Sequence, residues 1–124
     1  MTDSNNNENI SNEKLVRETW VEVPIKLAGR WWLFTPPDSY NLIYSTREEA
    51  ISAAAAFTRE RLAQIQQVEE EIGWIEKTLA LANDCLETSA LASELTQLDI
   101  CVAINNRILI AEKQRLAQLK KGMK

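Results

Sequence analysis

The stretch STREEAISAAAA, residues 45–56, decides the fold of this chain. Thr46, with Glu49 three residues later, forms a capping box, in which the hydroxyl and the carboxylate satisfy free amides at the start of a helix. Two glutamates in the first turn suit the positive end of the helix dipole, and the alanines that follow have the highest helix propensity. The pattern therefore predicts a helix that begins after Thr46.

No proline follows this helix start. Two apolar series with heptad spacing, which is typical of paired helices, run through the rest of the chain. The first series is Ile65, Val68, Ile72, Ile75, Leu79, Ala82 and Leu86. The second is Leu91, Leu95, Leu98, Val102, Asn105, Leu109, Glu112, Leu116 and Leu119. Together they predict a long antiparallel helical hairpin over residues 46–124.

The best break between the two helices lies at residues 83–89, where Ser89 is one of three candidate caps for the second helix. A loop centred near residues 86–87 places Ile72 opposite Val102. Gly73 lowers helix stability by about 1 kcal/mol relative to alanine. An alternative is therefore a break at Gly73 that gives three helices.

Charge is unevenly distributed along the chain, whose net charge is −4. Residues 46–88 hold 4 basic and 9 acidic side chains, whereas residues 89–124 hold 6 basic and 3 acidic ones. An acidic helix that faces a basic helix favours the antiparallel hairpin.

A small antiparallel meander of two or three strands is expected over residues 13–45. Residues 19–27 alternate between apolar and polar, as in a half-buried strand, and Pro24 predicts an edge position or a bulge. Gly29 supplies a turn into a second strand over 30–35, and residues 40–44 form a short third strand. The predicted fold class is α+β and mostly helical, with the meander packed on the hairpin.

Residues 1–12, MTDSNNNENISN, are polar and rich in asparagine. Such a segment cannot bury enough apolar area to offset its loss of conformational entropy. We expect a disordered tail, followed by a short helical turn that begins after Ser11 or Asn12.

The chain contains no histidine, the side chain used most often for acid–base catalysis. Its absence removes the Ser-His-Asp and Cys-His nucleophile systems and most catalytic zinc sites. Cys85 and Cys101 do not form a CxxC pair, which favours free thiols in a reducing compartment. We expect a protein that is not an enzyme and that needs neither a cofactor nor a metal.

Aromatic residues of the meander are the candidate surface for binding a partner. Adjacent strand residues point to opposite faces, so Trp31 and Trp32 make both faces of the second strand apolar. The hairpin covers one face and a partner covers the other. The alternative is an internal aromatic cluster. The expected partner-binding residues are Trp31, Trp32, Phe34, Tyr40 and Tyr44.

The second long helix carries a further apolar line, which makes its apolar stripe too wide for one partner helix. This line is Ile100, Ile104, Ile108 and Ala111. Either the sheet or a second copy of the chain covers it, and we expect both to do so. Asn105 is a polar residue of the kind that fixes register or oligomer state. The expected hairpin and dimer residues are Ile72, Leu98, Ile104, Asn105 and Ile108.

These features predict a cytoplasmic, homodimeric protein-interaction module that acts as an adaptor, assembly factor or inhibitor. No apolar run reaches the roughly 18 residues of a membrane span. One alternative is a nucleic-acid-associated regulator that uses the basic end of the last helix, although the overall pI of about 4.9 disfavours it. Another is a small-ligand pocket between sheet and hairpin, lined by Trp and Tyr.

Overall fold

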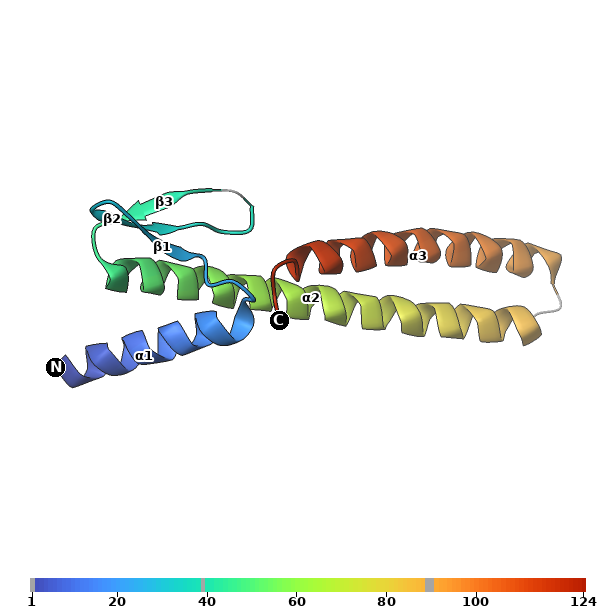
Figure 1. Ribbon diagram of the computed structural model, residues 1–124. Coiled ribbons are helices and arrows are strands. Elements are labelled where there is room, and N and C mark those ends of the chain that lie inside the picture. Colours follow the sequence, from blue (N-terminus) through green and yellow to red (C-terminus); the bar gives the residue numbers. More distant parts are fainter. Residues whose placement is uncertain (1, 39, 89–90) are drawn as a thin grey trace. The chain divides into compact units, whose positions relative to one another are not determined.

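The computed structural model describes residues 2–38, 40–88 and 91–124. This part of the chain is α+β and mostly helical, as predicted, with a three-stranded antiparallel sheet (Figure 1). Its elements are α1 (Thr2–Thr19), β1 (Ile25–Ala28), β2 (Trp31–Phe34), β3 (Leu42–Tyr44), α2 (Arg47–Thr88) and α3 (Ala92–Leu119). They form two units, and α2 contributes to both. The first unit is Met1–Ala63 with Lys120–Lys124, and the second is Gln64–Leu119.

The start of α2 confirms the Thr46 part of the predicted capping box, whereas the Glu49 carboxylate bonds to Ser45 and not to the cap amide. The amide of Glu49 donates to the Thr46 hydroxyl at 3.2 Å, and the Ala50 amide donates to the Thr46 carbonyl at 3.2 Å. The Glu49 carboxylate accepts from the Ser45 hydroxyl at 3.1 Å. From there α2 continues through Gly73 without a break, so the three-helix alternative is wrong.

The sheet is a simple meander in the order β1-β2-β3. Ala28 pairs with Trp31, so Gly29 and the next residue form a two-residue hairpin turn. Gly29 has φ 61, which the primed turns of such hairpins require at their first central position. β1 is an edge strand, as Pro24 predicted, but it begins only at Ile25 because the chain before it is still helical at Thr19.

The amino-terminal segment differs from the expected disordered tail, because residues 2–12 belong to α1. The carboxyl half of α1 is docked: Val16 is fully buried, and Asn12 accepts a hydrogen bond from Arg59 of α2 at 2.6 Å. A helix that has been nucleated by docking gains one hydrogen bond for each residue added. The polar, asparagine-rich composition of residues 2–12 therefore did not prevent them from joining the helix. Met1 lies outside the described residues.

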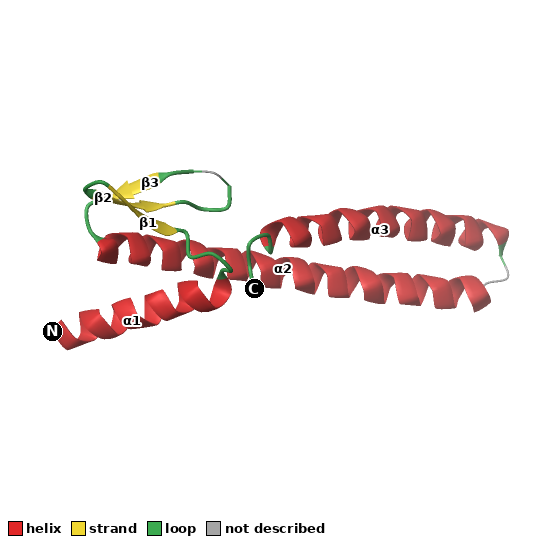
Figure 2. Ribbon diagram, in the orientation of Figure 1, coloured by secondary structure: helices red, strands yellow, loops and turns green. Residues whose placement is uncertain are grey.

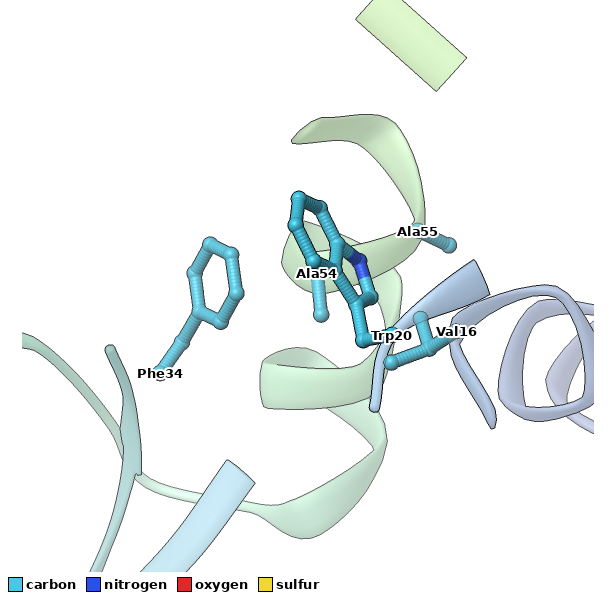
Figure 3. Packing of buried hydrophobic residues seen from close by; sticks show 5 residues of the cluster. All are labelled: Val16, Trp20, Phe34, Ala54 and Ala55. Carbon is cyan, nitrogen blue, oxygen red and sulfur yellow. The ribbon is translucent and has the colours of Figure 1, made fainter. Parts of the chain in front are cut away.

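The core of the first unit joins α1, β2 and the first turns of α2 (Figures 2 and 3). Its buried cluster is Val16, Trp20, Phe34, Ala54 and Ala55. Trp20 has only 2% of its surface exposed, and its indole N–H donates to the Thr58 hydroxyl at 2.9 Å. That hydroxyl in turn donates to the Ala54 carbonyl at 2.7 Å, so the buried polar groups are satisfied.

Residues 120–124 complete this unit from the other end of the chain. Trp20 forms a β-bridge with Met123, and the Val21 amide donates to the Gly122 carbonyl at 2.9 Å. Gly122 has φ 84, and a side chain there would lie 3.6 Å from the Trp20 ring. A Cβ would therefore fit beside the indole, and it is the positive φ that favours glycine at the end of the helical segment.

The second unit is an antiparallel hairpin of the rest of α2 and α3 (Figure 1). Glu71 contacts Glu112, and Lys113 forms a salt bridge with Glu76 at 3.8 Å. The predicted register placed Val102 opposite Glu71 and residue 97 opposite Glu76, so it is wrong by about 10 to 16 residues. The loop position contributes: α2 extends to Thr88 and α3 begins at Ala92, both later than a loop centred near residues 86–87 allows. Ser89, the last candidate cap, lies outside the described residues.

Replacing Thr58 by valine would leave the buried indole N–H of Trp20 without an acceptor. We expect Thr58→Val to lower the free energy of unfolding by about 1–3 kcal/mol, measured by urea denaturation. Thr78→Val is the matched control, because Thr78 is an exposed threonine on α2 whose hydroxyl also donates to the carbonyl four residues back. It should change stability by about 0.5 kcal/mol or less. Equal effects of the two substitutions would contradict the assigned role of Thr58.

Gly73 lies inside α2, and a Cβ added there would meet no atom within 4 Å. Gly73→Ala should therefore raise the free energy of unfolding by about 0.5–1 kcal/mol, since it removes only backbone freedom. Gly122→Ala should instead lower the free energy of unfolding, because alanine is strained at the positive φ of this position. Thermal melts followed by circular dichroism measure both. A destabilised Gly73→Ala would show that this glycine is needed for a close approach.

Candidate interaction surfaces

The two faces of the sheet have different surroundings. Directly paired residues of antiparallel strands share a face, so Trp32 and Phe34 lie on the inner face with their partners in β1 and β3. Trp31 and Leu33 lie on the outer face. Leu33 pairs with Ile43, which places Ile43 diagonally next to Trp31. Trp31 is 49% exposed and Ile43 is 64% exposed, so the outer face is an uncovered apolar surface.

The five aromatic residues expected to bind a partner do not form one patch. Phe34 is a correction: only 1% of it is exposed, because its ring packs edge-on against Phe57 of α2 at 5.5 Å between centroids. Tyr44 is half-buried against the same core, whereas Tyr40 is exposed. Of the β2 aromatics, only Trp31 is exposed. The arrangement is therefore neither a shared surface nor a closed internal cluster.

Trp32 is half-buried beside a charged junction between α1 and α2. The Arg47 guanidinium lies 6.0 Å from the Trp32 ring centre and also donates to the Glu13 carboxylate. Arg17 donates to the same carboxylate at 2.9 Å. The hydrogen bond from Arg47 holds the pKa of Glu13 below its usual value, and partial burial opposes this shift. The junction fixes α1 against the start of α2, and no sequence pattern pointed to it.

A groove of about 450 Å³ opens in the first unit beside Trp20. Its apolar walls come from the residues before β1 and after β2, including Pro24, Pro36 and Pro37, and Lys26 and Lys121 lie at its edge. The predicted ligand pocket was to be lined by several Trp and Tyr residues between sheet and hairpin. This groove differs, because its one aromatic residue is the buried Trp20.

The seam of the hairpin follows the predicted heptads closely. Ile72 is half-buried on α2, and so are Leu98 and Asn105 on α3. Ile104 and Ile108, which the prediction placed with them, are exposed instead. They belong to the second apolar line of α3, which the described residues leave uncovered. In the part of the chain that the structure describes, no residue of α3 is fully buried.

Two polar groups lie within this seam. The Asn105 amide donates to the Cys101 carbonyl at 2.8 Å, so this asparagine bonds to its own helix. Glu112 and Glu71 are close enough to share a hydrogen bond when one of the two carboxyl groups is protonated. That hydrogen bond and desolvation raise the pKa of Glu112, and its second oxygen is buried without a hydrogen-bond partner.

The contacts between α2 and α3 define two faces of the hairpin. One face is marked by the salt bridge between Lys113 and Glu76, and the other by the pair of Glu71 and Glu112. Residues three or four apart lie on the same side of a helix. Trp74 therefore lies on the face of Glu71, and Ile108 lies on the face of Glu112.

Several exposed apolar side chains lie on this second face, which we call the isoleucine face. Continuing by helical turns from Trp74 and Ile108 adds Leu81 on α2 and two isoleucines on α3. All five side chains are exposed. The isoleucine face consists of Trp74, Leu81, Ile100, Ile104 and Ile108. The spacing of seven residues between Trp74 and Leu81 was visible in the sequence, but both residues fell outside the predicted seam.

The basic end of the chain is partly engaged within the protein. Lys113 pairs with Glu76, and residues 120–124 form the turn and bridge beside Trp20. Cys85 and Cys101 are free thiols. Within the described ranges, no group of three or more candidate ligands could hold a metal ion. No helix there is long and apolar enough to cross a membrane.

The shared proton of Glu71 and Glu112 predicts a pH-dependent stability. Because the folded pKa of Glu112 is raised above 4.5, its contribution is fully present below pH 4.5 and is lost as the pH rises through the folded pKa. Glu112→Gln imitates the protonated form. The variant should be more stable than the wild type at pH 7, and the difference should vanish near pH 4.

Chemical denaturation at both pH values measures this difference, and Glu87→Gln at an exposed position of α2 is the control. The control should show no comparable pH-dependent difference. If the stability difference between Glu112→Gln and wild type is the same at both pH values, the shared proton is contradicted.

Comparisons with models of protein families, with curated proteins and with solved structures found no match for this chain. The geometry of the two units is therefore the only guide to function.

Proposed function

We propose that the protein is a non-enzymatic module that binds other protein chains, acting as an adaptor, assembly factor or inhibitor in the cytoplasm. One observation carries the proposal: large apolar side chains remain exposed in both units, although the first unit has already buried a core. Exposed apolar side chains that gather on one face are typical of protein interaction sites.

The outer face of the sheet is the proposed contact for a different protein. Trp31 and Ile43 adjoin each other there, with Leu33 between them and Lys26 at the edge strand. An aromatic anchor with aliphatic neighbours is the usual centre of an interface that binds strongly. Ile43 lies on the short edge strand β3 and is exposed, so this surface reaches the edge of the sheet.

The two alternative functions gain less support from the structure. A nucleic-acid site needs free basic groups on one surface, but Lys113 is paired with a carboxylate. The groove beside Trp20 has only one aromatic residue in its lining, instead of the several Trp and Tyr residues of the predicted ligand pocket.

Affinity capture from the cells that make the protein tests the outer face of the sheet. Wild type should retain at least one protein that Trp31→Ser and Ile43→Ser both lose, because each substitution removes an exposed apolar anchor. Tyr40→Ser is the matched control, since Tyr40 is an exposed aromatic residue outside the strand register. It should retain the same protein as wild type.

The folding of each variant is checked by circular dichroism. If wild type, Trp31→Ser and Ile43→Ser retain identical sets of proteins, the outer face is not the contact. If Tyr40→Ser loses the same protein, the contact is not confined to the outer face of the sheet.

A further inference from the structure

We propose that the isoleucine face of the hairpin binds a second copy of this chain, so that two hairpins form a four-helix bundle. The inference deepens the proposed function by naming one partner, and it concerns a surface separate from the outer face of the sheet. It rests on the repeat, the charges and the area of the isoleucine face.

The repeat indicates a helical partner. Trp74 and Leu81 are two turns apart on α2, and the three isoleucines follow one another at four-residue intervals on α3. Apolar side chains at such intervals on two adjacent helices form ridges that match the grooves of another helix pair. By the register of the hairpin, Trp74 lies about level with the small residue Ala111, which leaves room beside the indole for a side chain of the partner.

The charges indicate which helices meet. Residues 64–76 of α2 contain four glutamates and no basic residue, whereas residues 105–119 of α3 contain three basic residues and one glutamate. Within one chain these two segments lie against each other. If α2 of each copy lies on α3 of the other, the same acidic-to-basic pairing is repeated between copies.

This arrangement has a two-fold axis parallel to the bundle, and every helix is antiparallel to both of its neighbours. Arg115 is about level with Glu70 by the register of the hairpin, so Arg115 of one copy would lie near Glu70 of the other. In the reversed arrangement α2 would lie on α2, which places two acidic helices side by side and is electrostatically unfavourable.

The area is sufficient for a dimer. A buried apolar side chain removes on the order of 100 Å² from water, and a tryptophan about twice as much. Because the five side chains are about half exposed, each copy would bury roughly 350 Å² of them, a little under half of the roughly 800 Å² per partner of an ordinary stable interface. Polar residues at the rim supply the remainder in such interfaces.

Ile104→Asp tests the inference directly. Ile104 is 52% exposed, so the variant should keep its fold while placing a charge at the centre of the interface. Light scattering of the full chain should give twice 14.1 kDa for the wild type. The dissociation constant of the Ile104→Asp dimer should be higher than that of the wild-type dimer by about 30-fold or more.

Ile110→Asp is the matched control. Ile110 is 59% exposed on the same helix, but it lies three residues from Lys113 and so belongs to the opposite face of the hairpin. This variant should remain dimeric, and both variants should keep the helical circular dichroism of the wild type.

A charge exchange tests the arrangement of the helices. Arg115→Glu and Glu70→Lys should each weaken self-association, because each puts like charges together across the interface. A mixture of the two variants should form a mixed dimer, detected by native mass spectrometry. If mixing restores the dimer, each variant alone had lost the charge pairing between copies and not the stability of its own chain.

Three results would overturn the inference. If the wild type is monomeric at micromolar concentration, a second copy is not the partner of the isoleucine face. This holds even if the protein captures another protein through Ile104. Equal dimerisation of Ile104→Asp and wild type excludes the isoleucine face. Disruption by Ile104→Asp without any effect of the charge variants excludes the proposed arrangement. None of these results depends on the Trp31 experiment, so the two proposals can fail separately.

Discussion

The first unit depends on the burial of one indole ring. Trp20 ends α1, packs beside Phe57 of α2 with ring centroids 6.2 Å apart, and bridges to Met123. Its N–H reaches the Thr58 hydroxyl, so the large apolar ring is buried without leaving a polar atom unsatisfied. Helix docking, the start of the sheet and the return of the chain after α3 all depend on this one position.

Much of the fold could be predicted from local patterns, because those patterns act within a few residues. The Thr46 capping box, the turn at Gly29 and the seam that includes Ile72 and Leu98 each follow from spacing alone. The predicted strand boundaries were less accurate, since Trp20 was assigned to a strand although its burial completes α1. Local alternation cannot show which side chain a distant helix will cover.

The errors in the sites have the same cause. Phe34 and Trp31 look alike in the sequence, but only the packing of α2 decides that Phe34 is buried and that Trp31 stays exposed. The hairpin register depended on a loop whose position was placed too early, and every predicted pair moved with it. The uncovered isoleucines, by contrast, were foreseen as a stripe too wide for one partner helix, since width is a property of the pattern itself.

The return of residues 120–124 to the first unit has a consequence for the order of events during synthesis. The hairpin lies between two parts of that unit in the chain, so a ribosome delivers all of α3 before Gly122 and Met123 can reach the indole. The hairpin, with its local contacts, can form early, whereas the first unit must wait for its last strand-like segment. Until then one side of Trp20 lacks its cover, and a nascent chain paused within α3 holds the sheet and α1 in an unfinished state.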